Sequence, residues 1–160
     1  MIEVRVEGIL LDSVNNSPVV LLRERDGDRV LPVFIGPLEA SAIAYALEKT
    51  VFPRPLTLDL MRLMVEGLHG RVRRVIVTKL ENETFFAEIV IEAGDRVLTI
   101  DARPSDSVGL ALRTEAPIYV DEAVMEKAGQ WMTAQDEDRL KDLREKMRTI
   151  NPEDFGNYKM

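Results

Sequence analysis

A chain of 160 residues and 18.1 kDa has room for one ordinary domain. The apolar fraction of 46% and the charged fraction of 31% exclude a disordered or fibrous chain. The net charge of −7 argues against nucleic-acid binding through the overall field, and the absence of cysteine excludes disulfides, thiolate metal sites and cysteine nucleophiles.

Further classes are excluded by single features of the sequence. His69 is the only histidine, which excludes a zinc site built from several histidines. No apolar run approaches the 18 residues of a membrane span, and the N-terminus lacks the basic start and apolar stretch of a signal peptide. We therefore expect a soluble, cytoplasmic protein with no membrane partner.

The first half of the chain predicts strands followed by a helix. Residues 2–11 alternate between apolar and charged residues, which is typical of a half-buried strand. Residues 18–24 and 30–35 flank an Asp26-Gly27 turn and predict a hairpin. Pro37 suits the first turn of a helix that runs to about residue 49.

A second helix is predicted from about residue 57 to residue 69, and it is apolar nearly all round. Its polar residues form one narrow line along the helix: Asp59, Arg62, Glu66 and His69. Such a pattern predicts a buried helix with a single exposed seam.

The second half of the chain predicts three more strands and several helices. The strands span residues 72–80, 85–92 and 96–102, and are followed by a helix to about residue 113, a brief strand at 117–120, a helix at 121–128 and a charged helix at 133–150. Because the strands come in antiparallel groups, we predict an α+β fold with mixed, largely antiparallel sheets in a single compact domain. Its expected extent is residues 1–130, with residues 131–160 as a C-terminal helical tail. Leu140, Leu143, Met147 and Ile150 would dock that tail on the domain.

A basic run on the first of these strands is the one candidate nucleic-acid stripe: Arg71, Arg73, Arg74 and Lys79. Alternation places Arg74 on the face opposite to the other three. The alternative is a solvated face that pairs with Glu81, Glu88 or Glu92 across the sheet.

Two segments repeat one arrangement of residues at a helix start. Arg54 to Asp59 and Arg103 to Asp106 each contain an arginine, a proline, a hydroxyl group and an aspartate. Glu39 lies in the first turn of the earlier helix, and Asp101 lies two residues before Arg103. Each residue alone is explained by helix capping, since Thr57 and Ser105 are favoured N-caps and first-turn acids complement the helix dipole.

Taken together, these residues favour phosphodiester chemistry. Carboxylates are the ligands that Mg²⁺ and Mn²⁺ prefer, and such ions can activate water and stabilise an in-line displacement. Arginines and helix N-termini bind phosphate. We therefore predict that the helix starts near residues 57 and 105 lie close together, so that their acids face one cleft.

Three blocks of the sequence resemble the bifunctional nuclease family. They are LPVFIGPLEASAIAYALE, FPRPLTLDLM and IDARPSDSVGLALRTEAPIYV, within a similarity that covers about residues 1–128, and INPEDF resembles the tail of the family. The resemblance implies an α+β domain that forms a homodimer and a nuclease activity on DNA and RNA. Carried over by position, the polar motif residues are Glu39, Arg54, Thr57, Asp59, Asp101, Arg103, Ser105 and Asp106. Leu58 departs from the family, in which many members carry a histidine at that position.

Two hypotheses follow for the function. The first is a nuclease of low sequence specificity that depends on Mg²⁺ or Mn²⁺ and acts on DNA or RNA. In it, Asp59, Asp106, Arg54 and Arg103 are catalytic, Thr57, Ser105 and Glu39 bind substrate, and Asp59, Asp101 and Asp106 bind the metal. The second is a non-catalytic regulatory or interaction domain that binds a small anion or a protein partner, which Leu58 and the acidic net charge favour.

Overall fold

The computed structural model describes residues 1–149, which contain eight strands and five helices. The strands are β1 (Ile2–Leu11), β2 (Pro18–Glu24), β3 (Arg29–Phe34), β4 (Gly70–Glu81), β5 (Thr84–Ala93), β6 (Arg96–Ala102), β7 (Ile118–Val120) and β8 (Gln130–Trp131). The helices are α1 (Pro37–Leu47), α2 (Thr57–Gly67), α3 (Pro104–Thr114), α4 (Glu122–Ala128) and α5 (Ala134–Thr149). The sequence predicted each element except the two-residue strand β8.

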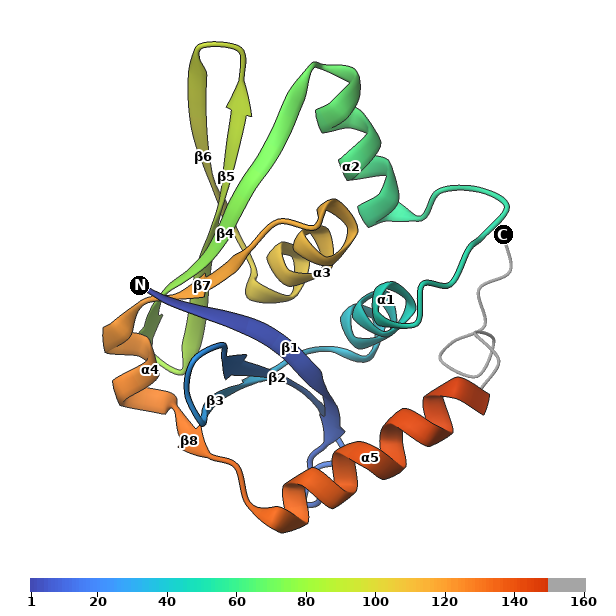
Figure 1. The fold of residues 1–160 in the computed structure, drawn as a ribbon, viewed down its shortest axis with the longest axis vertical. Helices are drawn as coiled ribbons and strands as arrows, with labels where there is room; N and C mark the ends of the chain where they lie inside the picture. The colour runs from blue at the N-terminus through green and yellow to red at the C-terminus, as the bar shows by residue number, and fades with distance from the viewer. Residues whose placement is uncertain (150–160) are drawn as a thin grey trace.

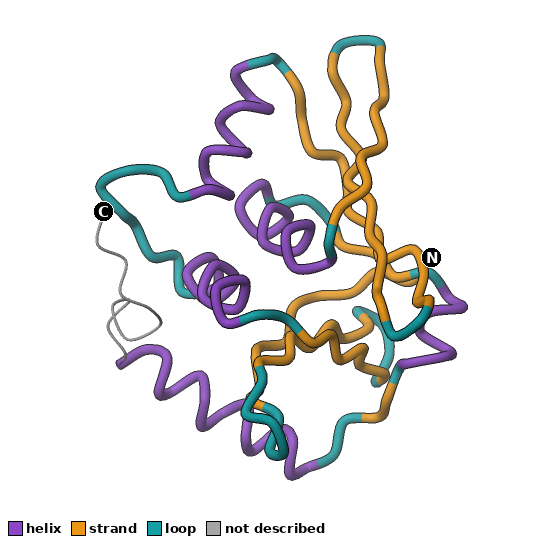
Figure 2. Tube along the Cα trace, turned by 180° about the vertical axis from the view of Figure 1, so that it is seen from behind, coloured by secondary structure: helices purple, strands orange, loops and turns teal. Residues whose placement is uncertain are grey.

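The described strands form one sheet in the order β6-β5-β4-β7-β1-β2-β3-β8. All neighbouring strands are antiparallel except β4 and β7, which run parallel. Helices α1, α2 and α3 group together beside this sheet, and α5 crosses below β1 (Figures 1 and 2). The predicted α+β class with a largely antiparallel sheet is therefore confirmed.

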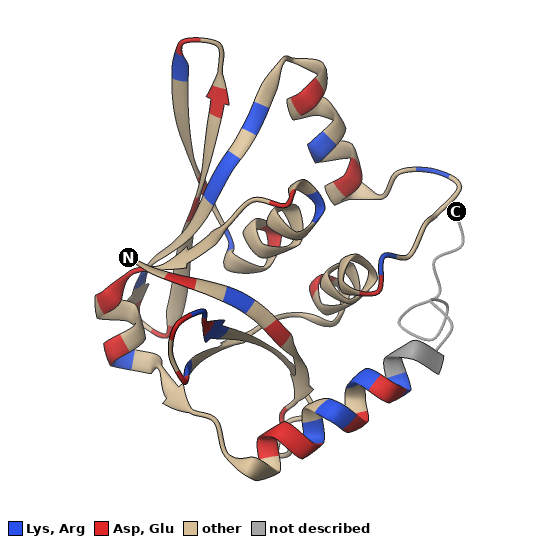
Figure 3. Cartoon of the chain, in the orientation of Figure 1, with Lys and Arg blue, Asp and Glu red and all other residues tan. Residues whose placement is uncertain are grey.

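The main core lies between the sheet and helices α1, α3 and α4. Its fully buried members include Leu22, Leu31, Ile43, Leu110 and Met125. Acidic and basic residues are interspersed along most elements, α5 in particular (Figure 3). Among residues 1–149, no helix is both long and apolar enough to cross a membrane.

Helix α5 covers a second, smaller core on β1, β2 and β3. Leu140 is 2% exposed and packs with Leu10, Val19, Leu21 and Val30. The docking predicted for this helix is confirmed through Leu140. Met147, Ile150 and the INPEDF segment lie where the structure describes no side chains.

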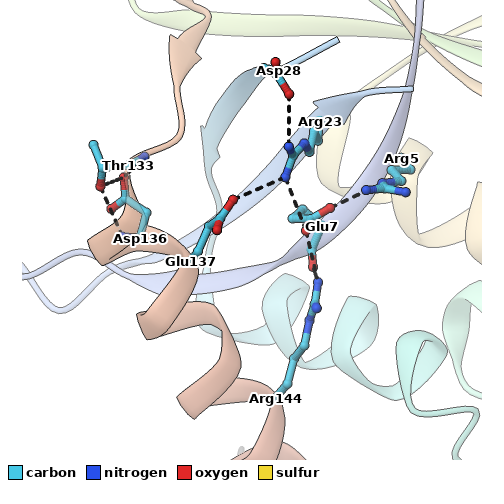
Figure 4. A network of polar contacts seen from close by, with 8 residues as sticks. All are labelled: Arg5, Glu7, Arg23, Asp28, Thr133, Asp136, Glu137 and Arg144. Atoms are coloured by element: carbon cyan, nitrogen blue, oxygen red, sulfur yellow. Dashed lines mark hydrogen bonds and ion pairs between the residues drawn. The ribbon is translucent and has the colours of Figure 1, made fainter. Parts of the chain in front are cut away.

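A polar network fastens α5 to the sheet (Figure 4). The Glu7 carboxylate on β1 lies 3.5 Å from Arg144 of α5 and 3.9 Å from Arg23 of β2. Arg23 in turn lies 3.8 Å from Glu137 of α5. The Glu7 side chain is only 14% exposed, so water solvates its charge poorly. Arginines from β2 and α5 balance that charge instead.

The prediction that the helix at 57–69 is buried is wrong. Only Leu58 is buried in α2, whereas Leu60 is 48%, Met64 57% and Leu68 77% exposed. Met61 and Val65 complete the narrow stripe that packs against the core. Hydrophobic periodicity cannot distinguish a helix buried on all sides from one whose second apolar face is open, because both are apolar all round.

Three of the four cations of the basic run on β4 form ion pairs within the sheet. Arg71 lies 2.7 Å and Arg73 2.5 Å from the Glu92 carboxylate on β5, and Lys79 lies 3.5 Å from Glu81. The Arg71–Glu92 hydrogen bond, together with the Arg73 charge, lowers the pKa of the Glu92 carboxyl. The paired, solvated face was therefore the better of the two interpretations.

Candidate functional site

Three of the predicted site residues meet at the N-terminal ends of α1 and α3. Arg103 donates from Nε and Nη2 to the two carboxylate oxygens of Asp106, at 2.8 and 3.1 Å. Its Nη1 donates to Oε1 of Glu39, 64 residues earlier in the chain, at 2.9 Å. We call Glu39, Arg103 and Asp106 the Arg103 cluster. The cluster is accessible, because the Arg103 side chain is 63% exposed.

The local sequence explains why both helices begin at this cluster. Each helix has a proline at its start, which fits the first turn, and neither N-cap residue, Gly36 or Arg103, makes a side-chain capping bond. The first-turn N–H groups of both helices therefore have no side-chain partner at the N-cap, and they carry the positive end of the helix dipole.

The two acids in the Arg103 cluster stabilise the protonated form of the arginine. The hydrogen bonds to Asp106 and then to Glu39 raise the pKa of Arg103 above its ordinary value. Arg103 thus occupies the place between two carboxylates that a bound cation would otherwise take.

Asp59 lies apart from this cluster and pairs with a different arginine. Its Oδ1 accepts a hydrogen bond from Nε of Arg113 at 3.0 Å, and its Oδ2 accepts one from the backbone N–H of Leu56 at 3.1 Å. Arg113 follows Asp106 by seven residues on α3, which is about 10 Å along the helix axis. Asp59 and Asp106 therefore associate with opposite ends of α3.

The sequence did not identify Arg113 as a site residue. Its side chain is 7% exposed and also donates to the carbonyl oxygens of Gly109 at 2.8 Å and Ala42 at 2.9 Å. Arg113 thereby links α1, α2 and α3. The available signal was a single arginine in the last turn of α3, directly after the apolar run 108–112, which is equally typical of a residue that complements the helix dipole.

The remaining predicted residues, Arg54, Thr57, Ser105 and Asp101, make none of the ion pairs of the Arg103 cluster. Arg54 and Thr57 are exposed before and at the start of α2, and Ser105 is only 7% exposed. Asp101 lies opposite Glu88 in the β5–β6 pairing, next to Ile100, which pairs with the core residue Ile89. Because neighbouring strand residues point to opposite faces, Asp101 projects away from the face that packs against the helices.

The prediction that Asp59, Asp101 and Asp106 converge on one cleft is wrong. Within residues 1–149, no group of three or more histidine, cysteine, aspartate or glutamate side chains could hold a metal ion. The residues present therefore do not fit a divalent ion held by these three carboxylates. The catalytic and substrate-binding roles of the single residues stay predictions.

Comparison with known proteins then decides the family. The sequence model of the bifunctional nuclease domain matches residues 20–133. The chain belongs to the bifunctional nuclease domain family. The match includes most of β2, all of β3 to β8 and α1 to α4, and both arginine–carboxylate groups, whereas α5 lies beyond it.

Relatives of two kinds share this domain. An uncharacterized protein of Mycobacterium tuberculosis is 42% identical over 96% of this chain and 97% of its own length. "Bifunctional nuclease 2" of Arabidopsis thaliana is 29% identical over 71% of this chain, and "Bifunctional nuclease 1" of Oryza sativa subsp. indica is 25% identical over 72%. The chain spans only 35% and 36% of the length of these two plant proteins.

The position at which Leu58 departs from the family motif is a core position in this chain. Leu58 is 7% exposed, and a Cβ added to Gly109 would lie 2.5 Å from its Cδ1. The side chain therefore packs flat against α3. Leu58 fills space between two helices and offers no group for acid–base chemistry.

Proposed function

We propose that this chain cleaves phosphodiester bonds in DNA and RNA with low sequence specificity, and that the Arg103 cluster is the reacting site. Family membership and the names of the plant relatives support the reaction class. The observation that carries the proposal is that Arg103, Glu39 and Asp106 meet where two helices present their N-terminal ends.

The two kinds of contact that Arg103 makes suggest separate roles for its neighbours. Arg103 donates two hydrogen bonds to Asp106, which orient the guanidinium, and only one to Glu39. A phosphate oxygen could replace Glu39 as the acceptor of the Nη1 hydrogen bond. The guanidinium plane would keep its orientation, because its two hydrogen bonds to Asp106 remain. The N–H groups in the first turns of α1 and α3 would bind other phosphate oxygens.

Release from Arg103 would change the chemistry of Glu39. Its carboxylate, no longer bonded to the guanidinium, would lie next to the bound phosphate and accept a proton from the attacking water. The water oxygen bonds to phosphorus, the bond from phosphorus to the departing nucleotide oxygen breaks, and that oxygen takes a proton from solvent. Arg103 would stabilise the charge that develops on the phosphoryl oxygens. In this proposal Asp106 positions the arginine, Arg103 binds the substrate and Glu39 is the general base.

A digestion assay with matched variants tests this proposal. Purified protein is incubated with end-labelled single-stranded DNA and RNA, with and without EDTA, beside Glu39→Gln, Arg103→Gln and the control Arg73→Gln. We expect the first two variants to lose about 10²-fold or more of the cleavage rate, as is usual for a general base or an oxyanion contact. Equal cleavage by all preparations would contradict the proposal and indicate a contaminating nuclease.

The EDTA arm tests the expected Mg²⁺ or Mn²⁺ dependence separately. Cleavage that stops with EDTA and returns with either ion would show that donors beyond the Arg103 cluster complete a metal site. Binding of the oligonucleotides without cleavage, in any metal, would favour the alternative function, a non-catalytic domain that binds an anion or a partner. That alternative is favoured by one observation: each carboxylate of the cluster is already bonded to an arginine.

We also propose that the chain forms a homodimer through the open faces of α2 and β6. These two elements carry large exposed apolar residues: Leu60, Leu63, Met64, Leu68, Val97, Leu98 and Ile100. The outer edge of β6 pairs with no other described strand, so its backbone groups are also open.

Light scattering should give twice 18.1 kDa for the natural chain and the single mass for Leu63→Glu with Met64→Glu. Val14→Glu, at an exposed apolar residue elsewhere, is the control; a natural chain of single mass would contradict the dimer.

A further inference from the structure

A polar pocket lies where α1 and α3 end and α2 begins, away from the Arg103 cluster. Its volume is about 210 Å³, and three cationic side chains line it: Lys49, Arg62 and Arg113. We propose that this pocket binds a small phosphate monoester. The inference goes beyond the proposed nuclease function, because neither Glu39 nor Arg103 lines this pocket.

One wall of the pocket is rigid and electrically balanced. Arg113 uses three of its five N–H donors, on Asp59, Gly109 and Ala42, and its side chain is almost fully buried. Asp59 is likewise fixed by the N–H of Leu56. The Asp59–Arg113 pair therefore sets the shape of the pocket and adds no net charge to it.

The side chains of Lys49 and Arg62 are not needed as hydrogen-bond donors to the last carbonyl groups of the helices. The last carbonyl groups of α1 accept hydrogen bonds from the backbone N–H groups of Glu48, Lys49 and Thr50, at 3.0 to 3.2 Å. In α3 the carbonyl of Ala111 accepts from the N–H of Ala116 at 3.1 Å. The side chains of Lys49 and Arg62 thus do not serve as C-terminal caps.

The donors on these two cations are largely free. Arg62 uses only Nη1, which bonds to Glu66 at 3.2 Å, and the Lys49 ammonium forms no ion pair within residues 1–149. Counting Glu66 and the balanced Asp59–Arg113 pair, the pocket keeps one positive charge in a chain of net charge −7. The neighbouring Glu48 lines a different cavity, beneath α5.

The other lining residues favour a phosphate that carries an organic group. Tyr45 and Phe52 meet edge to face, with ring centroids 4.9 Å apart, and both line the pocket. Thr50 adds a hydroxyl group to the lining. Cations and a hydroxyl group bind phosphate oxygens, whereas ring faces pack against an apolar or planar substituent. This combination suits a monoester better than inorganic phosphate alone.

Chemical-shift titration of the full chain at constant ionic strength tests this inference. The probes are inorganic phosphate and phenyl phosphate, and the variants are Lys49→Gln, Arg62→Gln, the control Lys79→Gln and Arg103→Gln. We expect the amide signals of residues 49–52 to shift with either probe. The dissociation constant should be smaller for phenyl phosphate than for inorganic phosphate. Each pocket variant should weaken that response about tenfold, while Lys79→Gln and Arg103→Gln leave it unchanged. Thermal melting of each variant shows that it is folded.

Two outcomes would overturn the proposed pocket. One is a titration in which only residues near Glu39 and Arg103 respond, which would leave the proposed nuclease site standing. The other is a response at residues 49–52 that Lys49→Gln and Arg62→Gln do not change. A nuclease assay in which Arg103→Gln is fully active would instead remove the nuclease proposal without affecting this pocket.

Discussion

The Glu39 carboxylate lies directly over Gly36, so that a Cβ added at Gly36 would fall 2.2 Å from Oε2. Gly36 is the N-cap of α1 and has an ordinary extended backbone, with φ of −75°. The glycine is therefore needed for space and not for backbone freedom. The absence of its side chain lets Glu39 fold back over the helix start toward Arg103.

Gly36→Ala should separate Glu39 from Arg103 at little cost in stability. The added methyl group displaces only the end of a flexible side chain, so we expect the free energy of unfolding to fall by less than about 1 kcal/mol. A double-mutant cycle between Glu39→Gln and Arg103→Gln, measured by urea unfolding, should lose its coupling in the Gly36→Ala background. A coupling energy of unchanged size would show that the glycine does not position Glu39.

Arg113→Met should destabilise the protein much more than loss of a surface arginine. The change removes the buried guanidinium that donates to Asp59 and to the carbonyl groups of Gly109 and Ala42, which we expect to cost about 2–4 kcal/mol of unfolding free energy. Arg71→Met, which removes an exposed ion pair with Glu92, is the matched control and should cost less than about 1 kcal/mol. Equal losses in the two variants would contradict the linking role of Arg113.

Leu58 and Gly109 should behave as one packing unit. Leu58→Ala should cost about 2–4 kcal/mol, because it opens a cavity against α3. Gly109→Ala should also destabilise, by about 1–3 kcal/mol, because its methyl group would fall 2.5 Å from Leu58. The double variant should lose less than the sum of the two, since the new methyl group enters the cavity. Additive losses would show that the two residues do not contact each other as described.

Most of the fold was predictable because local patterns determine it. The outer strands alternate, two helices begin at Pro37 and Pro104, and two hairpin turns carry a glycine beside an acidic residue, Asp26-Gly27 and Gly94-Asp95. The exposure of α2 was not predictable, because its two apolar faces have the same composition and only tertiary packing selects the one that contacts α3. The short strand β8 carries too few residues to show a period.

The candidate site was predictable only in part. The sequence indicated that Glu39, Arg103 and Asp106 belong to helix starts, and the fold brings those two helix starts together. It also suggested that Asp59 would join them, because the two Arg-Pro segments look alike. The segments differ in one respect that sequence does not show: Asp59 meets the C-terminal end of α3, where Arg113 holds it.

Acid should weaken the start of α5 through Asp136. Hydrogen bonds from the side chain and the backbone N–H of Thr133 lower the pKa of the Asp136 carboxyl, aided by Arg139. A lowered pKa in the folded state means that the contribution to stability is complete above the unfolded value, near 3.8, and is lost as pH falls through the folded value. Asp136→Asn should therefore flatten the fall in unfolding free energy between about pH 5 and pH 2. Asp95→Asn, at an exposed turn, is the control, and an equal slope in the natural chain and Asp136→Asn would contradict the assignment.

The proposed reaction depends on Arg103 changing partners from Glu39 to a substrate phosphate. The direct measurement is the affinity for a labelled single-stranded oligonucleotide and its cleavage rate, in one preparation each of the natural chain, Glu39→Gln and Arg103→Gln. We expect Glu39→Gln to bind the oligonucleotide as tightly as the natural chain or more tightly, because the Arg103 guanidinium is no longer paired with a carboxylate at residue 39. Its cleavage rate should fall about 10²-fold or more. Arg103→Gln should lose both binding and cleavage. An Arg103→Gln protein that binds and cleaves like the natural chain would contradict the proposed site.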